Sequence, residues 1–197
     1  MSPPVVGELP ADAPHTDHPW VRCWARAMLR LFGWKLIGDF PDLPKMLILV
    51  VPHSSAWDVI WGMLIKLALG MRIDFMAKSE LFFFPLGRFL RLLGAVPVDR
   101  HAAHGVVGAT VRLLKSKPVC WVALAPEGTR RACPKWRSGF WHIARLAKVP
   151  LCCVYIHYPE KVFGIGPVLE VTKDMAADIE QLRAIFAPYQ GRNRRRN

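Results

Sequence analysis

The sequence predicts one α/β domain, in which helices flank a mixed, largely parallel sheet. Short apolar runs typical of buried strands alternate along the chain with amphipathic helical patterns. A chain of 197 residues can bury a substantial core and usually forms a single domain. No internal repeat breaks the alternation. We therefore expect a folded domain over residues 20–190, with a disordered arm before it (1–19) and a basic tail after it (191–197).

The charge balance predicts an anionic partner. Lys and Arg total 27 against 15 Asp and Glu, so the formal net charge is +12. Such a charge favours nucleic acid, an acidic membrane surface or a phosphorylated substrate. Neither an RNP motif nor a C2H2 finger is present. Because apolar residues also make up 52% of the chain, the composition favours membrane lipid over nucleic acid.

The sequence predicts neither a transmembrane helix nor a signal peptide. The best apolar candidate, residues 59–71, contains Lys66 and is shorter than the roughly 20 residues that a span needs. Residues 1–19 hold acidic side chains and no Lys or Arg, unlike the basic start of a signal peptide. The cysteines form no C-x-x-C pair, and adjacent Cys152 and Cys153 should point to opposite faces of a strand. We expect reduced thiols in a reducing compartment.

The first expected element is a basic amphipathic helix over residues 20–34. WVRCWARAMLRLFGW repeats an arginine every four residues, at Arg22, Arg26 and Arg30, with tryptophans on neighbouring rows. This pattern suits the interface of an anionic membrane. An ordinary surface helix that packs its apolar stripe on the core fits the same pattern, and one helix can do both.

The next elements alternate between strand and helix. MLILVV (46–51) is apolar throughout, as expected for a strand buried on both faces. The helix that follows it (57–69) should end at Gly70. Residues 79–94 should be helical in parts, interrupted by Pro85 and Gly87. Further strands are expected over 72–77, 95–98, 119–125, 151–158 and 168–172, and further helices over 105–116, 139–148 and 175–187.

A first candidate site lies in VVPHSSAWD (50–58), where a strand gives way to a helix. His53 falls in the turn and Asp58 in the first helical turn, so the carboxylate can reach the imidazole. An ionised Asp58 would fix the tautomer of His53 and stabilise its imidazolium after proton abstraction. The same residues also fit a plain helix start, with Ser54 or Ser55 as the cap. A serine nucleophile is a weaker interpretation, because the G-x-S-x-G elbow is missing.

A second candidate site is LAPEGTRR (124–131), at the end of another buried strand. Gly128 would let the backbone approach a ligand closely, and Arg130 offers a planar fork to a phosphate or carboxylate. Glu127 could neutralise and aim that arginine. In isolation, a surface turn with an incidental ion pair explains this stretch as well.

Two further cations follow other expected strands. Arg100 comes directly after the strand in GAVPVDR (94–100), beside Asp99, and Lys78 stands just past the strand at 72–77. The Asp99–Arg100 pair also fits a solvated salt bridge. Because the carboxyl ends of parallel strands meet at one edge of a sheet, these cations could converge with the first two sites.

These motifs resemble those of the glycerolipid acyltransferases, the family of the bacterial 1-acyl-sn-glycerol-3-phosphate acyltransferase. HSSAWD matches the H-x4-D block of that family, and PEGTR matches its third block. KSELFFFPLGRFLRLLGAVPVDR is similar to the second block, and KVPLCCVYI resembles the fourth. Order and spacing agree over residues 45–160. The fourth block often reads V-P-x-x-P-V, whereas Cys153 and Val154 stand here where a second proline is expected.

The resemblance implies a reaction that transfers a fatty acyl group from acyl-CoA or an acyl-carrier protein to the hydroxyl of a lysophospholipid. His53 would remove the hydroxyl proton, and Asp58 would orient His53. This mechanism uses no metal, no further cofactor and no covalent acyl-enzyme. The favoured acceptor is 1-acylglycerol-3-phosphate, which gives phosphatidic acid.

The resemblance also implies an acceptor site. Arg100 and the turn formed by Gly128, Thr129 and Arg130 would hold the acceptor phosphate, and Glu127 would set the local geometry. Lys78 is an addition that rests on its position alone.

The expected location is peripheral, on the cytoplasmic face of the cell membrane, with residues 20–34 in place of the longer hydrophobic anchor of many members. Two alternatives remain. Another lyso-lipid, such as a lyso-aminolipid or a lysophospholipid being remodelled, could be the acceptor, since arginine also binds carboxylates. Outside the enzyme class, an anionic-lipid or nucleic-acid binding protein would use the charge but would need no His53–Asp58 pair.

Overall fold

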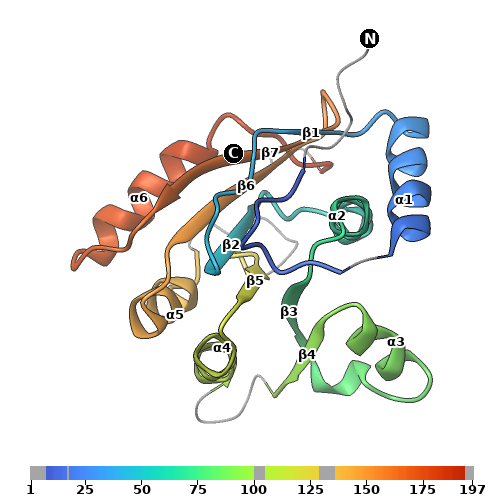
Figure 1. The fold of residues 1–197 in the computed structure, drawn as a ribbon. Helices are drawn as coiled ribbons and strands as arrows, with labels where there is room; N and C mark the ends of the chain where they lie inside the picture. Colours follow the sequence, from blue (N-terminus) through green and yellow to red (C-terminus); the bar gives the residue numbers. More distant parts are fainter. Residues whose placement is uncertain (1–7, 17, 100–104, 129–135, 194–197) are drawn as a thin grey trace.

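A seven-stranded sheet in the order β1-β7-β6-β2-β5-β3-β4 forms the centre of the computed structural model (Figure 1). Neighbouring strands are parallel except β6 and β7, which pair antiparallel. The structure describes residues 8–16, 18–99, 105–128 and 136–193. The predicted single α/β domain with a mixed, largely parallel sheet is therefore confirmed.

Strands and helices alternate along the chain nearly as predicted. The strands are β1 (Lys35–Ile37), β2 (Lys45–Val51), β3 (Ile73–Lys78), β4 (Ala95–Val98), β5 (Cys120–Leu124), β6 (Leu151–His157) and β7 (Val162–Leu169). The helices are α1 (Pro19–Leu31), α2 (Ala56–Leu69), α3 (Leu86–Leu92), α4 (Gly105–Ser116), α5 (Gly139–Ala147), α6 (Met175–Phe186) and a 3-10 turn, η1 (Ser79–Leu81).

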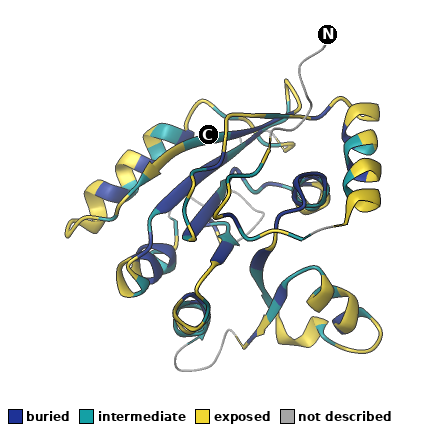
Figure 2. Ribbon diagram, viewed as in Figure 1, coloured by how far each residue is buried: buried dark blue, intermediate teal, exposed yellow. Residues whose placement is uncertain are grey.

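The sheet separates two hydrophobic cores (Figure 2). On one face, α1 and α2 pack over Trp34 and Trp121; on the other, α4, α5 and α6 pack over Phe140. Cys152 belongs to the first core and Cys153 to the second, as strand alternation predicted. Burial raises the pKa of each of these two thiols to about 12, so both stay protonated and unreactive at neutral pH.

The last strand lies earlier in the sequence than predicted. We expected a strand at 168–172, but β7 spans Val162–Leu169 and also pairs with the short β1, which the sequence did not predict. Gly164, Gly166 and Pro167 resemble strand breakers in the sequence. In the folded protein Gly164 is needed, because a Cβ there would collide with the ring of Tyr155 across the sheet.

Helix α1 turns Arg22 and Arg26 toward the end of α2, whereas Arg30, Trp20 and Trp24 are exposed. Arg26 Nε donates a 3.0 Å hydrogen bond to the carbonyl of Ala68, near the end of α2. Trp20 and Trp24 are 88% and 55% exposed. The stripe that contains Trp20 and Trp24 therefore does not pack on the core. Ala25 and Leu29 make the core contact of α1 instead. The helix also ends before the predicted Trp34, because the chain turns at Gly33 with φ of +73°.

Part of the segment expected to be disordered contacts the domain. Ala13 is buried, and the Thr16 N–H donates to the Gly70 carbonyl at 2.7 Å. His15 forms an isolated bridge with Met71. Over the ranges that the structure describes, no helix combines the length and the apolar character of a membrane span.

Lys66 joins α2 to the neighbouring strand and to the segment after α3. Its Nζ donates a 2.9 Å hydrogen bond to the carbonyl of Ile73 and a second bond to the carbonyl of Leu93. The side chain is buried, and this burial lowers the pKa of Lys66 from 10.5 to about 8, although the charge of Asp74 opposes the shift. Lys66 therefore loses its proton near pH 8 in the folded protein.

Replacing Lys66 with methionine should change how stability depends on pH. Between the folded and unfolded pKa values, the unfolded chain binds a proton that the folded chain lacks, so the free energy of unfolding rises with pH. From pH 8 to pH 10, we expect the wild type to gain about 2 kcal/mol relative to Lys66→Met. Urea unfolding at a series of pH values measures this difference. If the free energy of unfolding changes with pH in the same way for both proteins, the lowered pKa of Lys66 is contradicted.

Candidate active site

The turn after β2 forms the capped start of α2 at the carboxyl edge of the sheet. Ser55 is the N-cap: its Oγ accepts from Trp57 N–H at 3.3 Å, and its own N–H donates to Asp58 Oδ2 at 2.8 Å. These reciprocal bonds form a capping box, so the predicted serine cap of the helix start is confirmed. Ser54 is buried and donates its N–H to the same Asp58 oxygen at 2.7 Å. Both serines therefore support the turn.

The same carboxylate also reaches His53. His53 Nδ1 lies 3.4 Å from Asp58 Oδ2, and the side chains of the two residues are 22% and 1% exposed. The other carboxylate oxygen, Oδ1, accepts a 2.6 Å hydrogen bond from the hydroxyl of Tyr158. Asp58 thus takes part in the helix cap and also contacts His53. The helix-start interpretation of VVPHSSAWD and the His53–Asp58 pair are therefore compatible.

Glu127 lies beside His53 because β2 and β5 are parallel neighbours in the sheet. Glu127 is fully buried, and its Oε2 accepts the backbone N–H of His53 at 3.3 Å. The sequence predicted that these two strand ends meet, but it did not predict a contact between Glu127 and the His53 backbone. Glu127 therefore helps to fix the turn that carries the imidazole.

Gly128 brings a basic residue to the same edge. Its φ is +63°, and a Cβ at this position would lie 2.7 Å from Cδ of Arg137. The glycine therefore lets the Arg137 side chain cross the turn, and the Arg137 N–H donates to the Pro126 carbonyl at 2.9 Å. Sequence reasoning missed Arg137 because it lies outside the EGTR motif.

The remaining predicted site residues are placed only in part. Lys78 is the exposed last residue of β3 and lies at the same edge of the sheet as His53, with β5 between their strands. Arg100, Thr129 and Arg130 lie outside the described residues, so their contacts stay predictions. Within the described ranges, no three His, Cys, Asp or Glu side chains gather as a metal site.

Comparison with known proteins shows the family to which the chain belongs. A family model described as Acyltransferase matches residues 41–157, more than half of the 197-residue chain. The chain belongs to the acyltransferase family. The matched range contains His53, Asp58, Glu127 and Gly128. The predicted resemblance to glycerolipid acyltransferases is confirmed.

The fold of this acyltransferase is similar to that of a solved family structure. The crystal structure of the 1-acyl-sn-glycerophosphate (LPA) acyltransferase PlsC from Thermotoga maritima matches with a TM-score of 0.62 and 14% sequence identity. The match covers 86% of this chain and 77% of that chain. No curated protein sequence matches this chain significantly. At this identity, the structural likeness is evidence for a shared fold.

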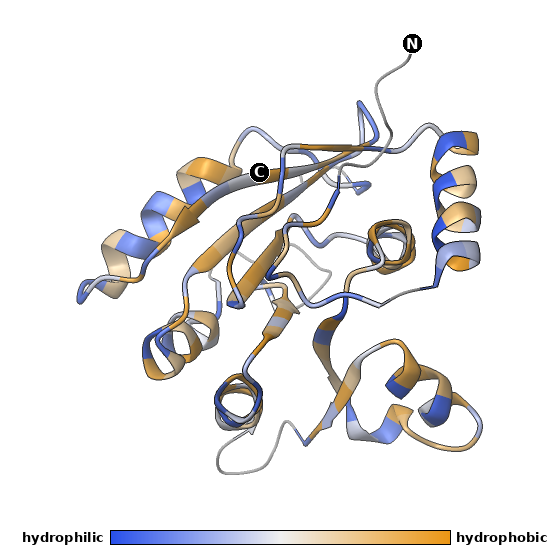
Figure 3. Ribbon diagram, viewed as in Figure 1, coloured by the Kyte–Doolittle hydropathy of each residue, from blue (hydrophilic) through white to orange (hydrophobic). Residues whose placement is uncertain are grey.

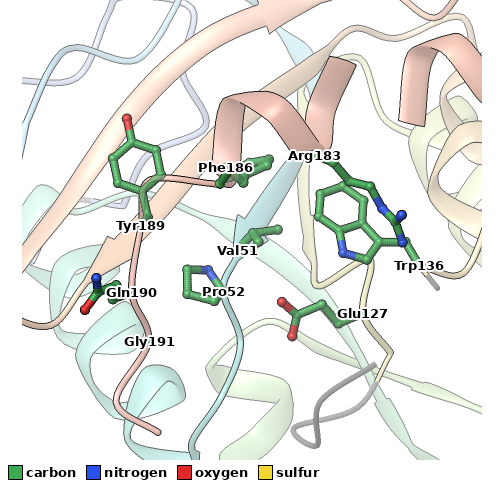
Figure 4. Close-up of a pocket in the computed structure, with 10 residues that line it drawn as sticks. Val51, Pro52, Glu127, Trp136, Arg183, Phe186, Tyr189, Gln190 and Gly191 are labelled. Atoms are coloured by element: carbon green, nitrogen blue, oxygen red, sulfur yellow. The ribbon is translucent and has the colours of Figure 1, made fainter. Parts of the chain in front are cut away.

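A pocket of about 590 Å³ adjoins the turn that carries His53. Figure 4 shows Glu127 between Pro52 and Trp136, with Arg183 lying along the Trp136 ring. Pockets of this volume commonly hold small molecules. The lining residues are Val51, Pro52, Glu127, Trp136, Arg183, Phe186, Ala187, Tyr189, Gln190 and Gly191.

The segment after α6 folds back over the turn, although residues 191–197 were expected to form a basic tail. Asn193 Nδ2 donates a 2.8 Å hydrogen bond to the carbonyl of Ser54. Gly191 packs so closely that a Cβ would lie 2.8 Å from Cβ of Ser54. The guanidinium of Arg192 lies 5.0 Å from the centre of the Trp57 ring. Residues 191–193 are thus part of the surroundings of His53.

Proposed function

We propose that this acyltransferase moves a fatty acyl group from a thioester of CoA or acyl-carrier protein to the free hydroxyl of 1-acylglycerol-3-phosphate, giving phosphatidic acid. The contact between His53 Nδ1 and the buried Asp58 carboxylate, at 3.4 Å, carries the proposal. An ionised Asp58 favours the tautomer with its proton on Nδ1, and that tautomer has its lone pair on Nε2. His53 is then able to act as a general base.

The proposed reaction conserves every proton. Nε2 of His53 takes the proton of the acceptor hydroxyl while the hydroxyl oxygen attacks the thioester carbon. The tetrahedral intermediate collapses, the carbon–sulfur bond breaks, and the imidazolium returns the proton to the leaving thiolate. The products are a new ester and a free thiol. Asp58 stabilises the imidazolium between these steps.

Cationic side chains at the carboxyl edge of the sheet are the proposed partners of the acceptor phosphate. Gly128, Thr129 and Arg130, together with Arg100, match the family motifs, and Lys78 ends a strand at the same edge. The exposed Arg137, which crosses the turn at Gly128, adds another positive charge there. An arginine binds a phosphate more strongly than a single neutral donor does, because its guanidinium can form two charge-assisted hydrogen bonds with it.

A panel of acceptors tests the proposed substrate. Thiol release from acyl-CoA should be at least about 10-fold faster with lysophosphatidic acid than with monoacylglycerol, which lacks only the phosphate, because charge-assisted hydrogen bonds to the phosphate are lost. Lysophosphatidylethanolamine and a lyso-aminolipid complete the panel. Equal rates with monoacylglycerol would reject phosphate recognition, and a preference for the lyso-aminolipid would support the alternative acceptor.

We also propose that the protein binds the cytoplasmic face of the membrane through a surface formed by α1 and the segment 81–92. Trp20 and Trp24 are exposed on α1, and Phe84 and Leu92 are 86% and 79% exposed on the second segment. Both elements lie on the same side of the molecule, and Figure 3 shows apolar residues along them. Large exposed apolar side chains next to basic ones suit an anionic bilayer.

A further inference from the structure

Tyr158 contacts the second carboxylate oxygen of Asp58. Its hydroxyl donates a 2.6 Å hydrogen bond to Oδ1, whereas His53 Nδ1 lies at Oδ2. Tyr158 follows β6 and stands just outside residues 41–157, which the family model matches. We propose that Tyr158 is a positioning residue, which orients the Asp58 carboxylate and through it the imidazole of His53. The inference rests on the proposed function of that pair.

Tyr158 is itself held in place by distant parts of the chain. Its backbone N–H donates to the carbonyl of Gln190 at 3.0 Å, in the segment that folds back over the turn. Its ring meets the buried Trp34 edge-on, with ring centres 5.0 Å apart and an angle of 89°. The hydroxyl therefore approaches Asp58 from a fixed direction, as a preorganised donor does.

The hydroxyl of Tyr158 limits rotation of the Asp58 carboxylate. Oδ2 accepts the N–H groups of Ser54 and Ser55, and Oδ1 accepts the Tyr158 hydroxyl, so both oxygens are held by donors. Without the hydroxyl, a buried carboxylate oxygen loses a charge-assisted hydrogen bond. The group can then rotate about its Cβ–Cγ bond and move Oδ2 relative to His53 Nδ1. Because this contact is already 3.4 Å long, a small rotation is enough to weaken it.

Tyr158 stays a donor at neutral pH. Burial raises the pKa of Tyr158, and the hydrogen bond and the negative charge of Asp58 raise it further. The phenol is thus protonated across the range in which His53 works as a base.

Tyr158→Phe removes only this hydroxyl, and Tyr155→Phe is the matched control. Tyr155 lies three residues earlier and packs in the opposite core, where its ring stacks on Tyr189 at 3.6 Å. We expect Tyr158→Phe to lower kcat about 10-fold, while KM for acyl-CoA and for lysophosphatidic acid stays within about 2-fold, because the lost contact orients a reacting group and does not hold substrate. Tyr155→Phe should keep the wild-type kcat.

A double-mutant cycle separates positioning from a general structural effect. If Tyr158 acts through Asp58, Tyr158→Phe should lower kcat no further in an Asp58→Ala background. An equal loss of kcat in both backgrounds would overturn the inference, and so would a wild-type kcat in Tyr158→Phe. Either result leaves the proposed function standing as long as the wild-type protein transfers the acyl group. A wild-type protein without acceptor-dependent thiol release would overturn the proposed function, and this inference with it.

Discussion

Replacing His53 with alanine should lower acceptor-dependent thiol release about 10³-fold, because a positioned general base contributes roughly 10²- to 10⁴-fold to such a reaction. The substitution removes the imidazole whose Nδ1 lies 3.4 Å from Asp58. The loss should fall on kcat, since the proton is transferred in the transition state. Initial rates measured with lysophosphatidic acid and acyl-CoA give the comparison.

The fold should tolerate the same substitution. Asp58 keeps the N–H groups of Ser54 and Ser55 and the Tyr158 hydroxyl as donors, so the helix start stays capped. His142→Ala is a matched control, because His142 is exposed on α5 in the opposite layer. We expect His142→Ala to be fully active and both variants to unfold near the wild-type midpoint. Wild-type turnover in His53→Ala would rule out His53 as the base.

Replacing Trp20 and Trp24 together with alanine should release the protein from anionic vesicles. If each exposed indole contributes about 2 kcal/mol on entering the interface, the double substitution should weaken binding roughly 10²- to 10³-fold. Flotation with vesicles of phosphatidylglycerol and phosphatidylcholine measures the bound fraction. Transfer to an acceptor dissolved below its micelle concentration should change little, because the partners of His53 and Asp58 in the proposed site lie outside α1.

A matched control comes from the other side of the sheet. Leu146 on α5 is 55% exposed, as is Trp24. Leu146→Ala therefore removes exposed apolar surface on the face of the sheet opposite to α1. This variant should bind vesicles like the wild type. If the double tryptophan variant also binds like the wild type, the membrane surface formed by α1 and 81–92 is wrongly assigned.

Features fixed by short stretches of sequence could be predicted. MLILVV has the continuous apolar character of a strand buried on both faces, and the residues of β2 are divided between the two cores as that character requires. A serine cap at the helix start, from Ser54 or Ser55, could be predicted because capping involves only neighbouring residues, and Ser55 is the cap. The strand ends that carry His53 and Glu127 were expected at one edge of the sheet, because parallel strands share that edge, but the contact of Glu127 with the His53 backbone was not predicted.

Features that depend on tertiary contacts could not be predicted. Tyr158 and Asp58 are 100 residues apart, and no local pattern encodes the strand order that brings them together. The glycines of β7 resemble strand breakers in the sequence, because the reason for Gly164 is the ring of Tyr155 on the neighbouring strand. The orientation of α1 was ambiguous because its arginines can face either solvent or the end of α2, and the contact of Arg26 with Ala68 decides it.

The most direct test of acyl transfer is a mass balance on the wild-type protein with acyl-CoA, in the presence and absence of lysophosphatidic acid. We expect one free thiol and one molecule of phosphatidic acid for each thioester consumed, and consumption only when the acceptor is present. Thiol release at the same rate without acceptor, or without formation of a diacyl lipid, would contradict His53-catalysed transfer to a lysophospholipid hydroxyl.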